Sequence, residues 1–115
     1  MTNPKRGELI INLGEKSWNS RVTMDGMAKI EHACGCGIMK VLSRLTDADV
    51  TTTEICQILL PVVKAGGNDV TLKDIQSAVW EAGLAEGMKA VGEILTKALM
   101  PEGDQSGNVE AAEAQ

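Results

Sequence analysis

Phenylalanine and tyrosine are absent from this 115-residue sequence, and Trp18 and Trp80 are its only aromatic residues. Proteins that hold single-stranded nucleic acid stack bases on aromatic rings and follow the backbone with a basic groove. Here 11 basic residues accompany 16 acidic ones, the net charge is −5, and the basic residues form no stripe. We therefore expect no nucleic-acid partner, and a core built from aliphatic side chains, alanine and methionine.

Long hydrophobic runs are also absent. No stretch approaches the roughly 20 apolar residues that a membrane-spanning helix requires. The N-terminal sequence MTNPKRGELI has no long apolar region and no small-residue cleavage site, so it does not resemble a secretory signal. The length is typical of one domain. We expect a single domain that resides in the cytoplasm and has no membrane partner.

Groups that carry catalysis are scarce. The chain has one histidine, no serine in the context of a nucleophile and no glycine-rich loop that could cradle a phosphate before a helix. Its carboxylates are spread singly over polar positions, as on a solvated surface. The sequence therefore predicts a protein that is not an enzyme and that needs no cofactor.

The few thiols lie close to the single histidine, in the stretch EHACGCGIM at residues 31–39. An odd count of three cysteines argues against a closed disulfide framework. The two glycines of the stretch suit a corner at which one helix ends and another begins, and we interpret the stretch in that way. A small metal-binding regulator stays an alternative, because four residues are of zinc-ligand type: His32, Cys34, Cys36 and Cys56.

Alternating apolar and polar residues predict a β-hairpin over residues 7–24. Leu9, Ile11 and Leu13 share one face of the first strand, and Trp18 and Ser20 share one face of the second. A hairpin of two strands is marginally stable alone in water, so we expect this one to pack on helices.

Helical spacing of apolar residues begins after the hairpin, over residues 25–100. Asp25 is our predicted N-cap of the first helix, and Thr51 with Glu54 has the spacing of a capping box. Pro61 predicts a kink in the helix that follows, and Gly66 with Gly67 its end.

Two further helices follow in the pattern. Thr71 and Asp74 have N-cap spacing, and the last helix is expected from Leu84 to Leu99, with Leu84, Met88, Val91, Leu95 and Ala98 as its apolar stripe. Residues 101–115 carry four acidic and no basic residues, and we expect them to form a disordered acidic tail. The predicted fold class is α+β: residues 1–100 form one domain, with an N-terminal hairpin packed on about four to five short helices.

Gly83 and Gly87 lie four positions apart in the last part of this pattern. Two interpretations stay open. In one, Gly83 only separates two helices, and its neighbours pack against the hairpin. In the other, the two small residues allow a close helix crossing or a docking groove, in which Trp80, Gly83, Gly87 and Met88 help to bind an amphipathic helical segment of a partner.

Several of these motifs together resemble a family of small proteins from gene transfer agents and tailed phages, described as tail-assembly-chaperone-like or tail-tube-associated. The resemblance covers roughly residues 5–100. It rests on Arg6-Gly7-Glu8 at the first strand, on Thr23, Gly26 and Glu31 around the first helix with Gly35 after it, on AGGNDVT at a helix end, and on Gly83-Leu84-Ala85. The family often has a bulky aromatic residue where this chain has Cys34, which implies a core position there.

The resemblance implies no catalytic residues. It implies a protein that acts as an assembly chaperone for a siphophage-type tail in the cytoplasm of the bacterial host. This chaperone would bind apolar helical segments of the tape-measure protein, and tail-tube subunits are a further partner that the resemblance suggests. A permanent structural component of the virion tail is the alternative. The sequence leaves open whether the chain forms homo-oligomers.

Overall fold

The computed structural model describes residues 7–100, which form a β-hairpin followed by five helices. The strands are β1 (Glu8–Leu13) and β2 (Lys16–Arg21), and the helices are α1 (Met24–Cys34), α2 (Ile38–Thr46), α3 (Thr52–Ala65), α4 (Leu72–Ala82) and α5 (Leu84–Leu99). This arrangement confirms the α+β fold class. The predicted acidic tail at residues 101–115 lies outside the described residues.

The hairpin has the predicted alternation. The two strands are antiparallel, and Leu13 pairs with Lys16 next to the turn. Ile11, Leu13 and Ser20 are buried on the face toward the helices, while Ile10 stays 55% exposed on the other face. A cross-strand ion pair joins Arg21 and Glu8 on that outer face at 2.9 Å. One face of the hairpin is therefore part of the core.

Helix starts are set by short-range hydrogen bonds. Thr51 and Thr71 each open a helix with a complete capping box, with Glu54 and Asp74 as the respective reciprocal acceptors, so both predicted N-caps are confirmed. The predicted cap Asp25 is wrong. The Thr23 hydroxyl accepts the Gly26 N–H at 2.9 Å, so the helix begins before Asp25, whose carboxylate instead pairs with Lys29.

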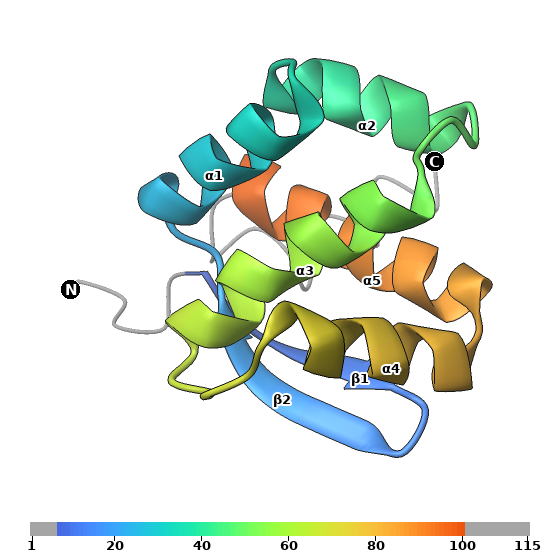
Figure 1. Ribbon diagram of the computed structural model, residues 1–115. Coiled ribbons are helices and arrows are strands. Elements are labelled where there is room, and N and C mark those ends of the chain that lie inside the picture. Colours follow the sequence, from blue (N-terminus) through green and yellow to red (C-terminus); the bar gives the residue numbers. More distant parts are fainter. Residues whose placement is uncertain (1–6, 101–115) are drawn as a thin grey trace, which may run out of the picture.

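Helix α3 lies at the centre of the molecule (Figure 1), with α1 and α2 on one side and α4 with the hairpin on the other. It contacts α1, β2, α4 and α5. Its inner face is buried and consists of Ile55, Cys56, Ile58, Leu59, Val62 and Val63. The helix continues through Pro61 and ends at Ala65, before Gly66 as predicted.

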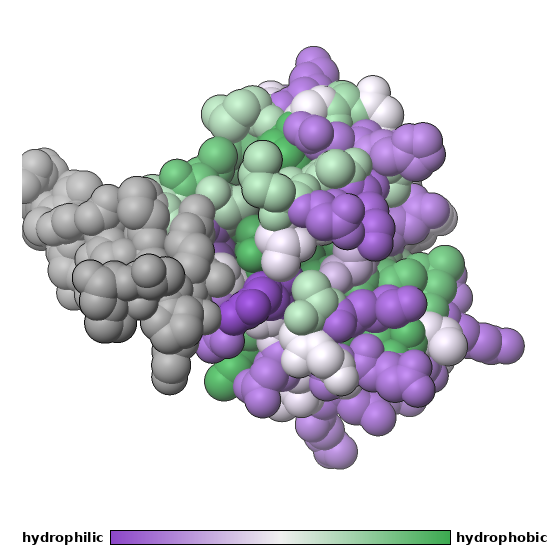
Figure 2. Space-filling model, turned by 90° about the vertical axis from the view of Figure 1, so that its left-hand side faces the viewer, coloured by the Kyte–Doolittle hydropathy of each residue, from purple (hydrophilic) through white to green (hydrophobic). Residues whose placement is uncertain are grey.

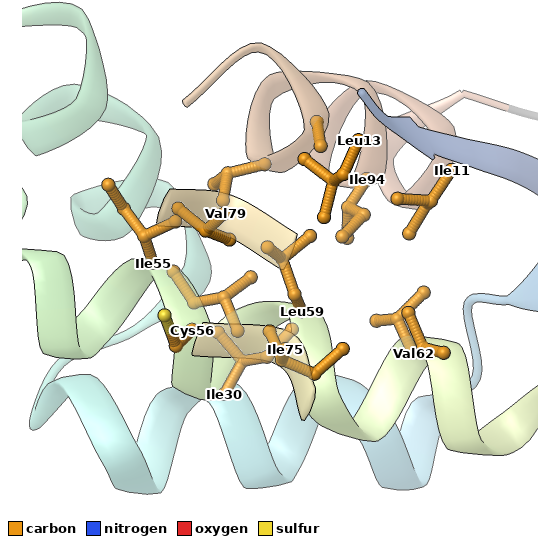
Figure 3. Packing of buried hydrophobic residues seen from close by; sticks show 14 of the residues in the cluster. Ile11, Leu13, Ile30, Ile55, Cys56, Leu59, Val62, Ile75, Val79 and Ile94 are labelled. Carbon is orange, nitrogen blue, oxygen red and sulfur yellow. The ribbon is translucent and has the colours of Figure 1, made fainter. Parts of the chain in front are cut away.

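Side chains from β1, α1, α3, α4 and α5 converge in one aliphatic core (Figure 3). Ile11 and Leu13 bring the hairpin into this cluster, and among residues 7–100 no side chain larger than leucine is fully buried. The absence of phenylalanine and tyrosine is thus compensated by many branched aliphatic residues, which pack in well-defined rotamers.

Helix α5 has the predicted bounds, and Val91 and Leu95 of the predicted stripe are buried, but the rest of the buried face differs. Leu84 is 40% exposed and Met88 is half-buried, although both belong to the predicted stripe. The buried residues are Gly87, Ala90, Val91, Ile94 and Leu95. Small residues at positions 87 and 90 let α5 approach its neighbours, which rotates the stripe away from Leu84.

No helix within residues 7–100 combines the length and apolar character needed to cross a bilayer.

Candidate functional site

The most exposed aromatic side chain borders a hollow between the first turn of α3, the second half of α4 and the start of α5. Trp80 is 78% exposed. The hollow has a volume of about 300 Å³, and it is lined by Thr52, Thr53, Cys56, Gln76, Val79, Trp80 and Leu84. We call this hollow the Trp80 notch. A large exposed aromatic residue beside an apolar hollow is typical of a protein-binding surface.

The four residues predicted to bind a partner have different positions around this notch. Trp80 lies at its edge. Gly83 joins α4 to α5 with a φ of +101°, a conformation that places Leu84 at the notch and that other residues rarely adopt. Gly83 therefore separates two helices, as the first of the two interpretations requires.

Gly87 lies beneath the surface. A Cβ atom at this position would meet Ile55 Cγ2 at 3.0 Å and Val79 Cγ1 at 3.1 Å, so Gly87 lets α5 pack closely on α3 and α4. Met88 is half-buried against the core. Trp80 and Leu84 are thus the residues of this region that offer apolar surface, and the two glycines position them.

Chemistry in the notch is restricted to binding. Among its lining residues, Cys56 has the only titratable side chain, and burial raises the pKa of its thiol. A neutral, buried thiol is a weak nucleophile and acts as a small hydrophobic group. The notch therefore suits an apolar side chain of another protein.

The corner at residues 31–39 shows no metal centre. Among residues 7–100, no group of three or more histidine, cysteine, aspartate or glutamate side chains has the geometry to hold a metal ion. His32 is exposed on α1, and Cys56 is buried on α3. Burial raises the pKa of the Cys34 thiol, and the nearby Glu54 carboxylate raises it further. Within the described chain, the metal-binding alternative thus finds no support.

The corner at residues 31–39 contains hydrogen bonds that hold the ends of two helices. Gly35 ends α1 with a φ of +72°. The Glu31 carboxylate accepts the N–H of Ile38 at 2.9 Å and so satisfies a donor at the start of α2. Thr23 and Glu31, two residues of the family-like pattern, therefore act as helix caps.

An ion pair fastens α2 to the start of α3. The Arg44 guanidinium donates two hydrogen bonds to the Glu54 carboxylate, at 2.6 and 3.1 Å. These two bonds raise the pKa of Arg44. Together with the hydrogen bond that Glu54 accepts from the Thr51 backbone, they lower the pKa of Glu54. Both side chains are largely buried, so the pair has a structural function.

The AGGND stretch after α3 holds the hairpin. A Cβ atom at Gly66 would lie 1.9 Å from the carbonyl oxygen of Asn19, so only glycine fits against β2. The Asn68 side-chain amide donates to the carbonyl groups of Asn19 and Val63, at 2.7 and 2.9 Å. The sequence pattern predicts only a helix end at this stretch. The asparagine itself indicates the additional contact, because its side chain can form hydrogen bonds with backbone groups.

Comparison with known proteins agrees with this structural reading of the motifs. No curated protein and no solved structure matches the chain. The family described as "Phage tail tube protein, GTA-gp10" matches residues 6–101, and thus all of the hairpin and the five helices. The chain therefore belongs to this family and is a tail-related protein of the phage or gene transfer agent type.

Proposed function

We propose that the protein is a non-enzymatic tail-assembly chaperone, which binds apolar helical segments of the tape-measure protein until tail-tube subunits enclose them. The observation that carries this proposal is the exposed side chain of Trp80 beside a notch that is lined by Cys56, Val79 and Leu84. An apolar side chain of a helical segment would fill the notch and stack against the indole ring. Membership of a phage tail family supports tail proteins as the partners.

The position of the two glycines strengthens this proposal. Gly83 directs the chain from α4 into α5, and Gly87 allows α5 to lie close to Val79. Leu84 is thereby held beside Trp80 on a rigid pair of helices. A preformed apolar surface loses little conformational entropy when it binds.

Co-purification with the tape-measure protein of the same tail tests the proposal. The unmodified chain should retain the tape-measure protein, and Trp80→Ala should lose most of it, since an aromatic anchor contributes roughly 2 kcal/mol or more to binding. Met39→Ala is the matched control, because Met39 on α2 is also an exposed large apolar residue, at 64%, and lies away from the notch. If both variants retain the tape-measure protein equally, the Trp80 notch is not its binding site.

A permanent structural role in the virion tail is the second candidate, and the description of the family as a tail tube protein favours it. The two functions differ in what a finished particle contains. Mass spectrometry of purified particles should detect a structural component in stoichiometric amounts, whereas a chaperone should be absent from them.

A further inference from the structure

A second apolar groove runs between α1 and α3. Its volume is about 530 Å³. Gly26 and Ala33 contribute from α1, and Leu60 and Pro61 from α3, with Leu72 at the start of α4. Figure 2 shows the side of the molecule at which α1 begins and α3 ends, where apolar residues lie among hydrophilic ones. We call this hollow the α1/α3 groove.

The shape of the α1/α3 groove suits a helix. Two packed helices form its walls, and the α1 wall offers small residues, since Gly26 has no side chain and Ala33 only a methyl group. Small side chains allow a third helix to approach closely, at a distance of 8–10 Å between helix axes. An extended strand would find no free strand edge between two helices.

The charge of the groove is opposite to that of the chain. The whole protein has a net charge of −5, but the charged residues that line the groove are Lys29, Lys64 and Asp25. Asp25 is already paired with Lys29 at 3.2 Å. Within residues 7–100, Lys64 forms no ion pair, and its side chain is exposed on the α3 wall. The rim therefore presents net positive charge.

Pro61 adds a polar feature to the α3 wall. Proline has no N–H, so the carbonyl of Gln57, four residues earlier, receives no hydrogen bond from that position of the helix. Gln57 itself lines the groove. The groove thus combines apolar side chains with the polar side chain of Gln57.

We propose that the α1/α3 groove is a docking site for an amphipathic helix of a partner protein, with a stripe of leucine and alanine on the groove floor and acidic residues flanking it beside Lys64 and Lys29. The site is separate from the Trp80 notch and does not depend on it. A chain with two such surfaces can hold two helical segments at once, which increases overall affinity without new contacts at either site.

Titration of the isotopically labelled full-length protein with a synthetic peptide tests the proposal. The peptide has about five helical turns and a leucine and alanine stripe flanked on both sides by glutamate. A matched peptide carries lysine in place of each glutamate. The glutamate peptide should shift the amide resonances of the groove residues, Gly26, Ala33, Gln57 and Lys64 among them, and should bind more tightly than the lysine peptide.

Matched variants separate the contribution of the groove's charge to peptide binding from that of its shape. Lys64→Glu should weaken binding of the glutamate peptide roughly three- to ten-fold, since it replaces an attraction by a repulsion, and Lys89→Glu on the exposed face of α5 should change it by less than about two-fold. Ala33→Met should fill the groove and weaken binding, whereas Ala28→Met, at an exposed position of α1, should not. Trp80→Ala should leave peptide binding unchanged.

Equal binding of the two peptides, or resonance shifts confined to the Trp80 notch, would overturn the proposal. Binding that appears only after removal of residues 101–115 would also overturn it, because the acidic end of the chain itself would then be the occupant. Since no tape-measure protein enters these titrations, their failure leaves the proposed chaperone function untouched.

Discussion

The glycine corners at residues 35–37 and 66–68 use the same residue type for different physical reasons. Gly35 has a φ of +72°, and no atom lies within 4 Å of the position where its Cβ would be. Gly66 has an ordinary φ of −81°, but its Cβ would lie 1.9 Å from a carbonyl oxygen of β2. The first corner requires glycine because its backbone is in the left-handed conformation. The second requires glycine because β2 leaves no room for a Cβ atom.

This difference shows which parts of the fold tolerate change. The corner between α1 and α2 is fastened by the side chain of Glu31, and the other end of α2 is joined to α3 through Arg44 and Glu54. The corner after α3 is fastened by direct contact between two backbone segments and by Asn68. Side chains can adjust when an atom is added, whereas two packed backbone segments must separate.

The largest expected effect is that of Gly66→Ala. The added methyl group would push β2 away from α3 and should cost about 3 kcal/mol or more of unfolding free energy, since no flexible side chain can move aside. Gly67→Ala is the matched control, because Gly67 has a φ of +98° and open space around it, and should cost only about 1–2 kcal/mol. Urea denaturation followed by circular dichroism measures both, and equal losses would contradict the distinction.

Asn68→Ala should have the next largest effect. It removes two hydrogen bonds and leaves the carbonyl groups of Asn19 and Val63 without this donor, which should cost about 1.5 kcal/mol. Asn68→Asp should be at least as destabilising, because a carboxylate cannot donate to either carbonyl. If Asn68→Asp is as stable as the unmodified chain, the hydrogen bonds of Asn68 between the hairpin and α3 do not contribute to the free energy of unfolding.

At the first corner, Gly35→Ala should cost about 1 kcal/mol, the penalty of a left-handed conformation for a residue with a Cβ. Gly35→Asn should cost less, because asparagine tolerates this conformation. Thermal melts of the two variants against the unmodified chain measure the difference. A loss from Gly35→Ala as large as that from Gly66→Ala would mean that the first corner is also packed against other atoms.

The smallest effect concerns the ion pair between Arg44 and Glu54, which joins α2 to the start of α3. Glu54→Gln keeps the capping box, which accepts glutamine, but removes the charge that faces Arg44, and should cost about 0.5–1 kcal/mol at neutral pH. The pKa of Glu54 is lower in the folded protein than its ordinary value of 4.5. Its contribution is therefore present above that value and is lost as the pH falls through the folded-state pKa.

The measurement is the unfolding free energy of both proteins between pH 7 and pH 3, read from urea denaturation. The unmodified chain and Glu54→Gln should differ at neutral pH and converge in acid. A difference that persists unchanged in acid would assign the effect to packing of the side chain and not to its charge.

Local patterns in the sequence were sufficient for the element order, because their causes lie within a few residues. Alternation predicted the hairpin, and Thr51 and Thr71 fixed the starts of two helices through bonds to residues three positions later. The start of α5 followed in the same way, from Gly83 directly before it. The partner-binding role of Trp80 stays a prediction.

Contacts between distant residues decided the rest. The predicted buried stripe of α5 includes Leu84 and Met88, but Gly87 and Ala90 lie on the buried face in their place. Ile55 and Val79 of other helices approach that face at Gly87. Asn68 reaches a carbonyl 49 residues away in the chain, and Gly66 meets the same strand. No local pattern encodes such contacts, because they arise only when α3 and the hairpin pack together.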